Sequence, residues 1–217
     1  MKIVFISINV PQKLAGLLAN NLDLDDDQAE VAYYGIELVW SLILNFFLIT
    51  FLAVLTGTLL QAVIGGLTGA VLRLFAGGAH SNSPWRCALV GAVVLSAFGR
   101  LAIYLATVAA AILPYFMCLS TLAVLVVVWF LAPVDSPAKP ITNLRKRRNL
   151  RALALGCVAT MGIVEAILAY GHEQLASSLA FVMGMCLLWQ GFSLTRLGHR
   201  VLGKLDGVLS LKKKEVS

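Results

Sequence analysis

The sequence predicts an all-α integral membrane protein, with about six transmembrane helices and an amphipathic interfacial helix at each end. Of the 217 residues, 59% are hydrophobic and only 13% are charged, far fewer charges than ordinary soluble domains carry. The hydrophobic residues form long runs that suit membrane spans. The Lys and Arg residues gather in a few loops and in the C-terminal segment, a pattern typical of multi-pass membrane proteins.

We expect one membrane domain over residues 1–217, without a separate soluble domain. Residues 1–30 form an interfacial segment, because their apolar run is too short to span and is broken by Asn9 and Pro11. The bundle covers 31–194, and 195–217 is a basic interfacial segment. The spans are expected at 31–55, 59–75, 84–109, 114–131, 152–170 and 175–194. A four-span arrangement, in which the weaker segments lie flat, stays open.

Charge predicts the orientation of this bundle in a cell membrane. The loops after the first, third and fifth spans lack Lys and Arg, whereas the loops after the second and fourth spans and the C-terminal segment hold nearly all of them. Positive residues stay in the cytoplasm. We therefore expect both termini, and the loop between the second and third spans, on the cytoplasmic side.

The four cysteines show no paired spacing, and three of them lie inside apolar runs. Neither a disulfide framework nor a metal site is predicted from that pattern. No stretch resembles a nucleotide-binding loop. We expect no cofactor, and we read the net charge of +6 as an orientation signal and not as a sign of a nucleic-acid partner.

Residues 73–87 hold the strongest candidate for chemistry. Gly77 and Gly78 end the apolar run before them, since glycine turns sharply without a Cβ clash. Ser83-Pro84 then predicts the start of a helix, which places Cys87 at the end of its first turn. The helix dipole and the neighbouring Arg86 favour a thiolate there.

His80 is the candidate general base for Cys87. Seven residues of unbroken helix would hold the two about 10 Å apart, too far for proton transfer. The Gly-Gly and Ser-Pro breaks allow the chain to fold His80 back towards Cys87, and such a pair is common in covalent acyl chemistry. The amides of Gly77 and Gly78, or those at the helix start, are candidate oxyanion donors. The alternative to catalysis is a purely structural role, with a buried core cysteine and a packed histidine.

At these residues the chain resembles the accessory gene regulator B (AgrB-like) family of membrane cysteine peptidases in quorum sensing. The resemblance is carried by G-G-A-H with Cys87 seven residues after His80, by Arg73 before the glycines, and by A-P-V-D-S-P-A-K-P with a basic cluster over 132–148. It extends from about residue 30 to the end.

The resemblance implies a cysteine endopeptidase that cleaves an AgrD-like propeptide through an acyl-enzyme and promotes its cyclisation to a thiolactone or lactone. It also implies a homodimer, for which a face with Gly65 and Gly69 is one possible contact. The acidic part of the propeptide would meet basic side chains. The candidates are Arg73, Arg86, Arg100, Lys146 and Arg147, although the 145–148 cluster can equally serve topology alone.

A non-enzymatic small transporter or assembly factor is the alternative class. It would use Glu37, Arg100 and Glu165 as polar sites within the membrane, with Arg100 paired to one of the two carboxylates. A third residue that orients His80 is not evident from the sequence. Asn82, Asn45 and Glu37 are candidates.

Overall fold

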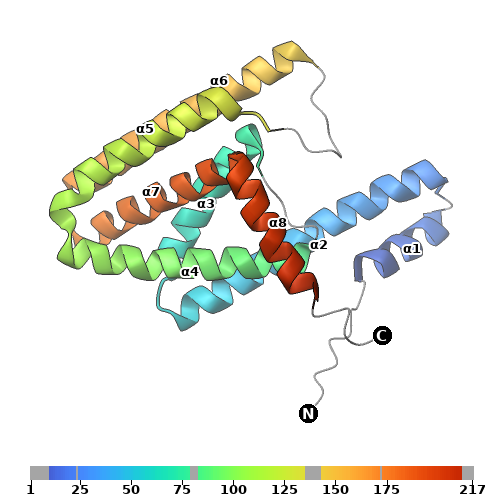
Figure 1. Ribbon diagram of the computed structural model, residues 1–217. Helices are drawn as coiled ribbons and strands as arrows, with labels where there is room; N and C mark the ends of the chain where they lie inside the picture. The colour runs from blue at the N-terminus through green and yellow to red at the C-terminus, as the bar shows by residue number, and fades with distance from the viewer. Residues whose placement is uncertain (1–9, 23, 79–82, 135–142, 172, 212–217) are drawn as a thin grey trace.

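The structure is a computed structural model that describes residues 10–22, 24–78, 83–134, 143–171 and 173–211. These residues form helices and short connections, and none of them lies in a strand (Figure 1). In chain order the helices are α1 (Val10–Leu22), α2 (Asp26–Leu55), α3 (Leu59–Ala76), α4 (Pro84–Val108), the short 3-10 turn η1 (Ala110–Ile112), α5 (Leu113–Leu131), α6 (Leu144–Tyr170), α7 (Gln174–Leu194) and α8 (Arg196–Leu211). The predicted fold class is confirmed.

Six of these helices are long and apolar enough to cross a membrane: α2, α3, α4, η1 with α5, α6, and α7. The shortest, α3, has 18 residues. A helix of that length spans about 27 Å, close to the roughly 30 Å of a bilayer's hydrocarbon core. The chain therefore has the architecture of a multi-pass membrane protein.

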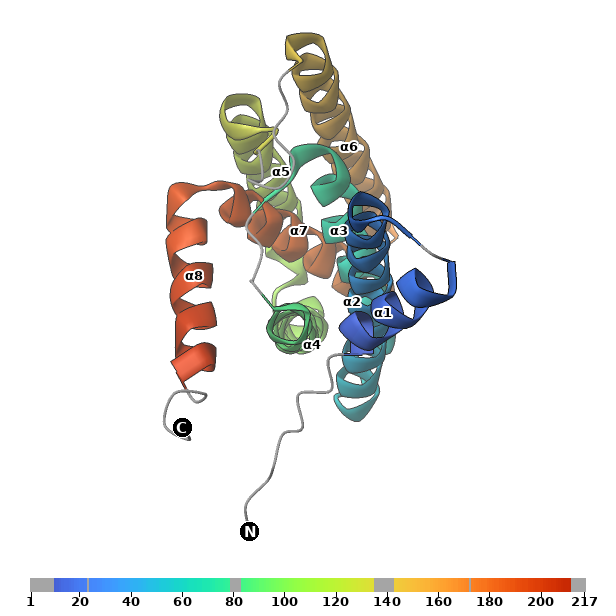
Figure 2. The same ribbon diagram turned by 90° about the vertical axis from the view of Figure 1, so that its right-hand side faces the viewer.

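The central helix of the bundle is α7, because α3, α4, α5 and α6 all pack against it (Figure 2). Its side chains Phe181 and Leu187 are fully buried. A Cβ added at Gly65 of α3 would lie 2.7 Å from Cys186 Sγ of α7, so the small residue permits a close helix contact. Gly65 is thus engaged within the chain, and it is not available for the contact between two copies considered above.

One end of the bundle collects most of the positive charge, and we call it the basic end. The ends of α3, α5 and α7 meet there with the starts of α4 and α6. Two hydrogen bonds connect the end of α3 to its neighbours there. Val134 N, just after α5, donates to Ala76 O at 2.9 Å, and Gln190 Nε2 of α7 donates to Gly77 O at 2.8 Å. The basic side chains at this end are Arg73, Arg86, Arg145, Lys146, Arg147, Arg148, Arg151, Arg196, Arg200 and Lys204.

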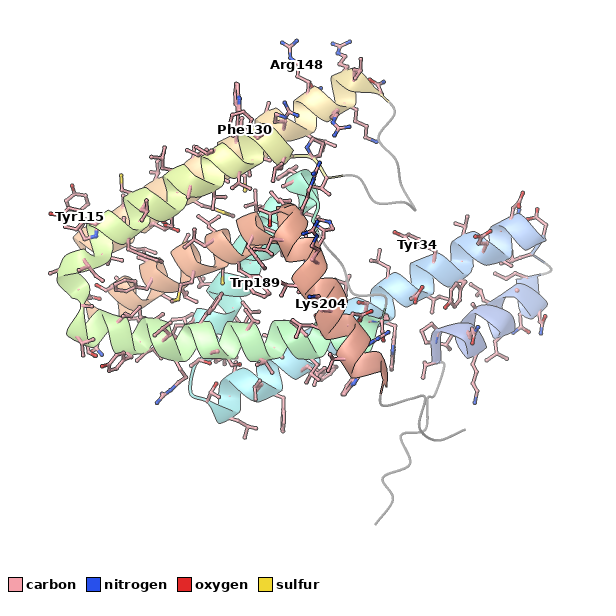
Figure 3. The ribbon with its side chains drawn as sticks, in the orientation of Figure 1. Tyr34, Tyr115, Phe130, Arg148, Trp189 and Lys204 are labelled. Carbon is pink, nitrogen blue, oxygen red and sulfur yellow. The ribbon has the colours of Figure 1, made fainter. Side chains whose placement is uncertain are left out.

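The fifth spanning helix begins earlier than predicted. Residues 144–151 were expected in a loop, but they form the first two turns of α6. Asn143 caps this helix, since its Oδ1 accepts from the backbone N–H of Arg145 at 2.9 Å and of Lys146 at 3.3 Å. Leu, Arg and Lys are strong helix formers behind such a cap. Figure 3 shows the consequence: Arg148 lies beyond Phe130 of α5, on an overhang of α6.

Two amphipathic helices flank the bundle, as the sequence predicts. The N-terminal helix, α1, packs beside the first turns of α2. The C-terminal helix, α8, does not continue the direction of α7. It crosses the basic end at a steep angle to α4 (Figures 1 and 2), the orientation that an interfacial helix takes beside membrane spans.

Candidate active site at the basic end

Cys87 lies where the sequence places it, at the end of the first turn of α4. Ser83 precedes the helix and Pro84 is its first residue. The backbone N–H of Cys87 donates to Ser83 O at 3.0 Å, which closes the first helical hydrogen bond. Helix geometry leaves the N–H groups of Trp85 and Arg86 without an intrahelical acceptor. The thiol is half-buried and sits at the positive end of the helix dipole.

The Gly77-Gly78 pair redirects the chain sharply after α3. Both residues have positive φ, 74° for Gly77 and 135° for Gly78, conformations that residues with a Cβ rarely adopt. Space is restricted as well, since a Cβ on Gly77 would lie 2.5 Å from Val134 O and one on Gly78 would lie 2.6 Å from Ser193 Oγ. The Gly-Gly segment is therefore held between the end of α7 and the residues after α5.

The hydrogen bonds of Gly77 bear on the predicted oxyanion donors. Its N–H donates to Arg73 O at 2.9 Å, and its carbonyl accepts from Gln190 Nε2. With the Gly77 amide engaged in this way, the amide of Gly78 and those of Trp85 and Arg86 remain as candidates. The predicted base, His80, lies in segment 79–82, outside the described residues.

A pocket of about 90 Å³ opens beside Cys87. Arg73, from the last turn of α3, lines it together with Cys87. Arg86, Ser193 and Asp206 complete its polar side. The structure thus brings together two predicted site residues that are 14 positions apart and belong to different helices.

Arg86 is paired with α8. Its Nε lies 3.2 Å from Asp206 Oδ1, and its Nη1 donates to the backbone carbonyl of Asp206 at 2.7 Å. Sequence reasoning missed Asp206. The available signal was its place as the acidic residue of 196–211, in register with Leu202 and Leu205 at helical i, i+3 and i+4 spacing. The substrate-binding role assigned to Arg86 stays a prediction.

The 145–148 cluster divides between two environments. Lys146 is exposed on the overhang of α6. Arg147 is half-buried, and its Nη2 donates to Pro133 O at 3.5 Å, while Arg151 Nε donates to Ala132 O at 2.7 Å. These two guanidinium groups satisfy carbonyls at the carboxyl end of α5, where cations are favourable. Arg147 and Arg151 therefore hold α5 to α6.

Arg100 does not belong to this site. It lies 13 residues after Cys87 on the same helix (100 − 87), a separation of about 20 Å along the axis, and its side chain is exposed. The expected pairing with Glu37 or Glu165 is not found among the described residues. Glu165 is instead buried and accepts a 3.4 Å hydrogen bond from Thr121 Oγ1 of α5.

The candidates for orienting His80 lie in different places. Asn82 is outside the described residues. Asn45 of α2 lies beside Gly91 of α4, one turn after Cys87, since a Cβ on Gly91 would be 3.8 Å from Asn45 Oδ1. Glu37 lies about two turns before Asn45 on α2. The structure thus places one of the three candidates, Asn45, against the turn that follows Cys87.

Comparison with known proteins agrees with this picture over nearly the whole chain. The profile of the accessory gene regulator B family matches residues 11–194. An AgrB-like protein 2 of Clostridium perfringens strain 13 is 23% identical over 204 residues, covering 91% of this chain and 95% of that protein. An AgrB-like protein of C. perfringens strain SM101 is also 23% identical, over 206 residues, with coverages of 91% and 95%.

A third relative comes from another genus. Protein FsrB of Enterococcus faecalis is 27% identical over 160 residues, which cover 70% of this chain and 64% of FsrB. No solved structure matches the fold. The family match covers all six spans, Cys87 and Arg73, and on this basis the chain belongs to the accessory gene regulator B family, whose members take part in the processing of quorum-sensing peptides.

Proposed function

We propose that this protein is a membrane-embedded cysteine endopeptidase that matures a quorum-sensing propeptide. The observation that carries the proposal is the position of Cys87: at a helix start, half-buried, and lining a pocket together with the basic side chain of Arg73. Positive charge and a helix N-terminus both favour the thiolate, which is the nucleophilic form of cysteine. Cys118, Cys157 and Cys186 lie inside the spans of α5, α6 and α7 and lack this environment.

In the proposed reaction the Cys87 thiolate attacks a peptide carbonyl carbon. The C–S bond forms, the C–N bond breaks, and His80 in its protonated form gives its proton to the leaving amine. The products are a thioester on Cys87 and the released C-terminal part of the substrate. In this proposal Arg73 stabilises the thiolate before attack, and the amides of Gly78, Trp85 and Arg86 are the candidate donors to the oxyanion of the intermediate.

Family membership supplies the fate of the acyl group in this proposal. A Cys or Ser side chain within the bound peptide attacks the thioester, regenerates the Cys87 thiolate and closes a thiolactone or lactone ring. Exchange of one thioester for another is nearly isoenergetic, so the step needs no nucleotide. The same reasoning gives a homodimer, for which the structure offers no specific contact.

The substrate in this proposal is an AgrD-like propeptide with an acidic C-terminal portion. Arg145, Lys146 and Arg148 are exposed on the overhang of α6 at the basic end, where they can attract carboxylates. Positive charge at that end favours the cytoplasmic side of the membrane for it and for Cys87. The propeptide would then reach the site from the compartment in which it is made.

The test is mass spectrometry of a candidate propeptide incubated with the full-length protein in liposomes. We expect a C-terminal fragment from the wild type and an acyl adduct on Cys87, and neither product from Cys87→Ala or His80→Ala. Cys118→Ala is the matched control, since Cys118 lies in α5 and is exposed away from the pocket, and it should cleave as the wild type does. Cleavage that survives Cys87→Ala would overturn the proposed nucleophile.

A further inference from the structure

The pocket beside Cys87 has an apolar side that the reaction described above does not use. Besides Arg73 and Arg86 it is lined by the apolar side chains of Val90, Trp189, Leu202 and Leu205. Three different helices supply this wall, namely α4, α7 and α8. An apolar surface next to a nucleophile is suited to hold an apolar part of the substrate.

The apolar wall has two halves, one of them a tryptophan from α7 and the other two leucines from α8. Trp189 is held edge-on against Phe98, with ring centroids 6.2 Å apart, and tilted against Phe192 at 5.9 Å. Such aromatic contacts fix the orientation of the indole. The other half of the wall comes from Leu202 and Leu205, on the face of α8 that carries Asp206.

The position of α8 is set by its ion pair. Asp206 follows Leu205 directly, and it is tied to Arg86, the residue before Cys87, by the ion pair and by the 2.7 Å hydrogen bond to its carbonyl. The pair is largely buried, with side-chain exposures of 21% and 10%. The Arg86–Asp206 pair therefore fixes the position of Leu202 and Leu205 relative to Cys87.

The size of the pocket limits what it can hold. It measures about 90 Å³, less than the roughly 150 Å³ of an engineered apolar cavity that binds one benzene molecule. This volume favours an aliphatic side chain of modest size over an aromatic ring. Because the substrate carbonyl must reach Cys87 Sγ, the side chain nearest the thiol belongs to the residue that carries that carbonyl.

We propose that the pocket binds the side chain of the residue whose carbonyl Cys87 attacks, and that Leu202 and Leu205 of α8 select a small aliphatic side chain at that position. The assignment to a peptide rests on the proposed function. In the acyl-enzyme this residue stays bonded to Cys87 Sγ, so the pocket is occupied until the ring closes. Its apolar wall then shields the thioester from water on one side.

The experiment measures access to the pocket without a peptide. Methyl, 2-methylpropyl and benzyl methanethiosulfonate are applied to the full chain in liposomes, and the rate of disulfide formation at Cys87 is followed by mass spectrometry. Each rate is divided by the rate of the same reagent with glutathione. We expect comparable normalised rates for the methyl and 2-methylpropyl reagents, and a rate roughly tenfold lower for the benzyl reagent, the scale of discrimination that apolar pockets achieve.

Enlarging the pocket should remove this discrimination. In Leu202→Ala/Leu205→Ala the benzyl rate should rise towards the methyl rate, which itself stays unchanged. The matched control is Leu197→Ala/Val208→Ala, on exposed positions of the same helix, and it should keep the wild-type ratio. Leu205→Trp tests the opposite direction, because filling the pocket should slow the 2-methylpropyl reagent and spare the methyl one.

The outcomes separate this inference from the proposed function. A benzyl-to-methyl ratio that stays at the wild-type value in Leu202→Ala/Leu205→Ala, with a normal methyl rate, would overturn the pocket assignment even if the wild type cleaves a propeptide. A ratio that changes as expected supports the pocket. If the protein then cleaves no propeptide, the proposed peptidase function is contradicted, and so is the assignment of the pocket to a peptide side chain.

Discussion

At the scale of single residues, Arg73 is the side chain whose position explains most about the site. It belongs to the last turn of α3, yet it lines the pocket of Cys87. Sequence alone places Arg73 before a glycine pair and Cys87 after a helix start. Their meeting depends on the turn at Gly77-Gly78, because α3 and α4 must reverse there. The turn therefore brings the charge of Arg73 to the pocket that Cys87 lines.

We expect Arg73→Ala to slow alkylation of Cys87 by iodoacetamide at pH 7 by a factor on the order of ten, since the thiolate loses a nearby positive charge. Arg73→Lys should retain most of the rate because it keeps the charge. The measurement is the alkylation rate at Cys87 by mass spectrometry, divided by the rate of the same reagent with glutathione. Equal rates in the wild type and in Arg73→Ala would show that the charge does not act on the thiol.

Gly78→Ala should destabilise the basic end. The added methyl would lie 2.6 Å from Ser193 Oγ, and the φ of 135° is unfavourable for alanine, so we expect a cost of about 1–3 kcal/mol. The measurement is thermal unfolding in detergent, together with the labelling rate of Cys87. Gly69→Ala is the control, because nothing lies within 4 Å of its Cβ position. A Gly78→Ala protein as stable as Gly69→Ala would contradict the close packing of this segment.

At the scale of elements, the sequence predicts the number and order of the helices but not where all of them begin. Hydropathy found the spans because each must match the bilayer thickness. It missed the first two turns of α6, because Arg145 to Arg148 are strongly polar, and polar residues were assigned to a loop. Helix propensity and the Asn143 cap decide the backbone there, whereas hydropathy reports only the depth of a residue in the membrane.

The same limit applies to α8. Its amphipathic pattern predicts an interfacial helix, and the structure shows a separate helix over Arg196–Leu211 that does not continue the direction of α7. The pattern does not reveal that Asp206 reaches Arg86, 120 positions earlier in the chain. Ion pairs between distant segments depend on how helices pack, and a single sequence carries no direct signal for them. The residues on the α8 side of the pocket were missed for this reason.

We expect Asp206→Asn to loosen α8 and expose Cys87. A loss of about 1.4 kcal/mol of docking free energy would raise the open fraction about tenfold, and labelling of Cys87 by the anionic reagent sulfonatoethyl methanethiosulfonate should accelerate accordingly. Combining Arg86→Asp with Asp206→Arg should restore part of the protection, because the charge pair is rebuilt while the hydrogen bond to the Asp206 carbonyl is lost. Unchanged labelling in Asp206→Asn would mean that the ion pair does not hold the helix.

At the scale of the whole molecule, the charge distribution divides the bundle into two ends. Ten of the basic side chains lie at the basic end, and the described connections at the opposite end, 56–58, 109–112, 171 and 173, carry none. This asymmetry was readable from the sequence, because it depends only on which loops hold Lys and Arg. The pocket at the basic end was harder to predict from the sequence, since its lining residues come from four helices, α3, α4, α7 and α8.

The orientation in the membrane is testable with introduced cysteines in a background without the native ones. Lys146→Cys lies at the basic end and Tyr170→Cys at the opposite end, and both positions are exposed. In intact cells an impermeant maleimide should label Tyr170→Cys, whereas Lys146→Cys should react only after permeabilisation. The reverse pattern would place the site outside the cytoplasm and would contradict the proposed delivery of the substrate.

The contacts of α7 and α8 with the Gly77-Gly78 turn and with the start of α4 have a consequence during synthesis of the chain, because α7 and α8 are made last. A ribosome that has made residues 1–188 has already translated Cys87, Arg73 and five of the six spans. Gln190, which binds the Gly77 carbonyl, and Asp206, which anchors the α8 side of the pocket, have not yet been translated. Cys87 therefore exists in the nascent chain before the pocket around it can form, and the pocket is complete only when the residues up to Asp206 have emerged.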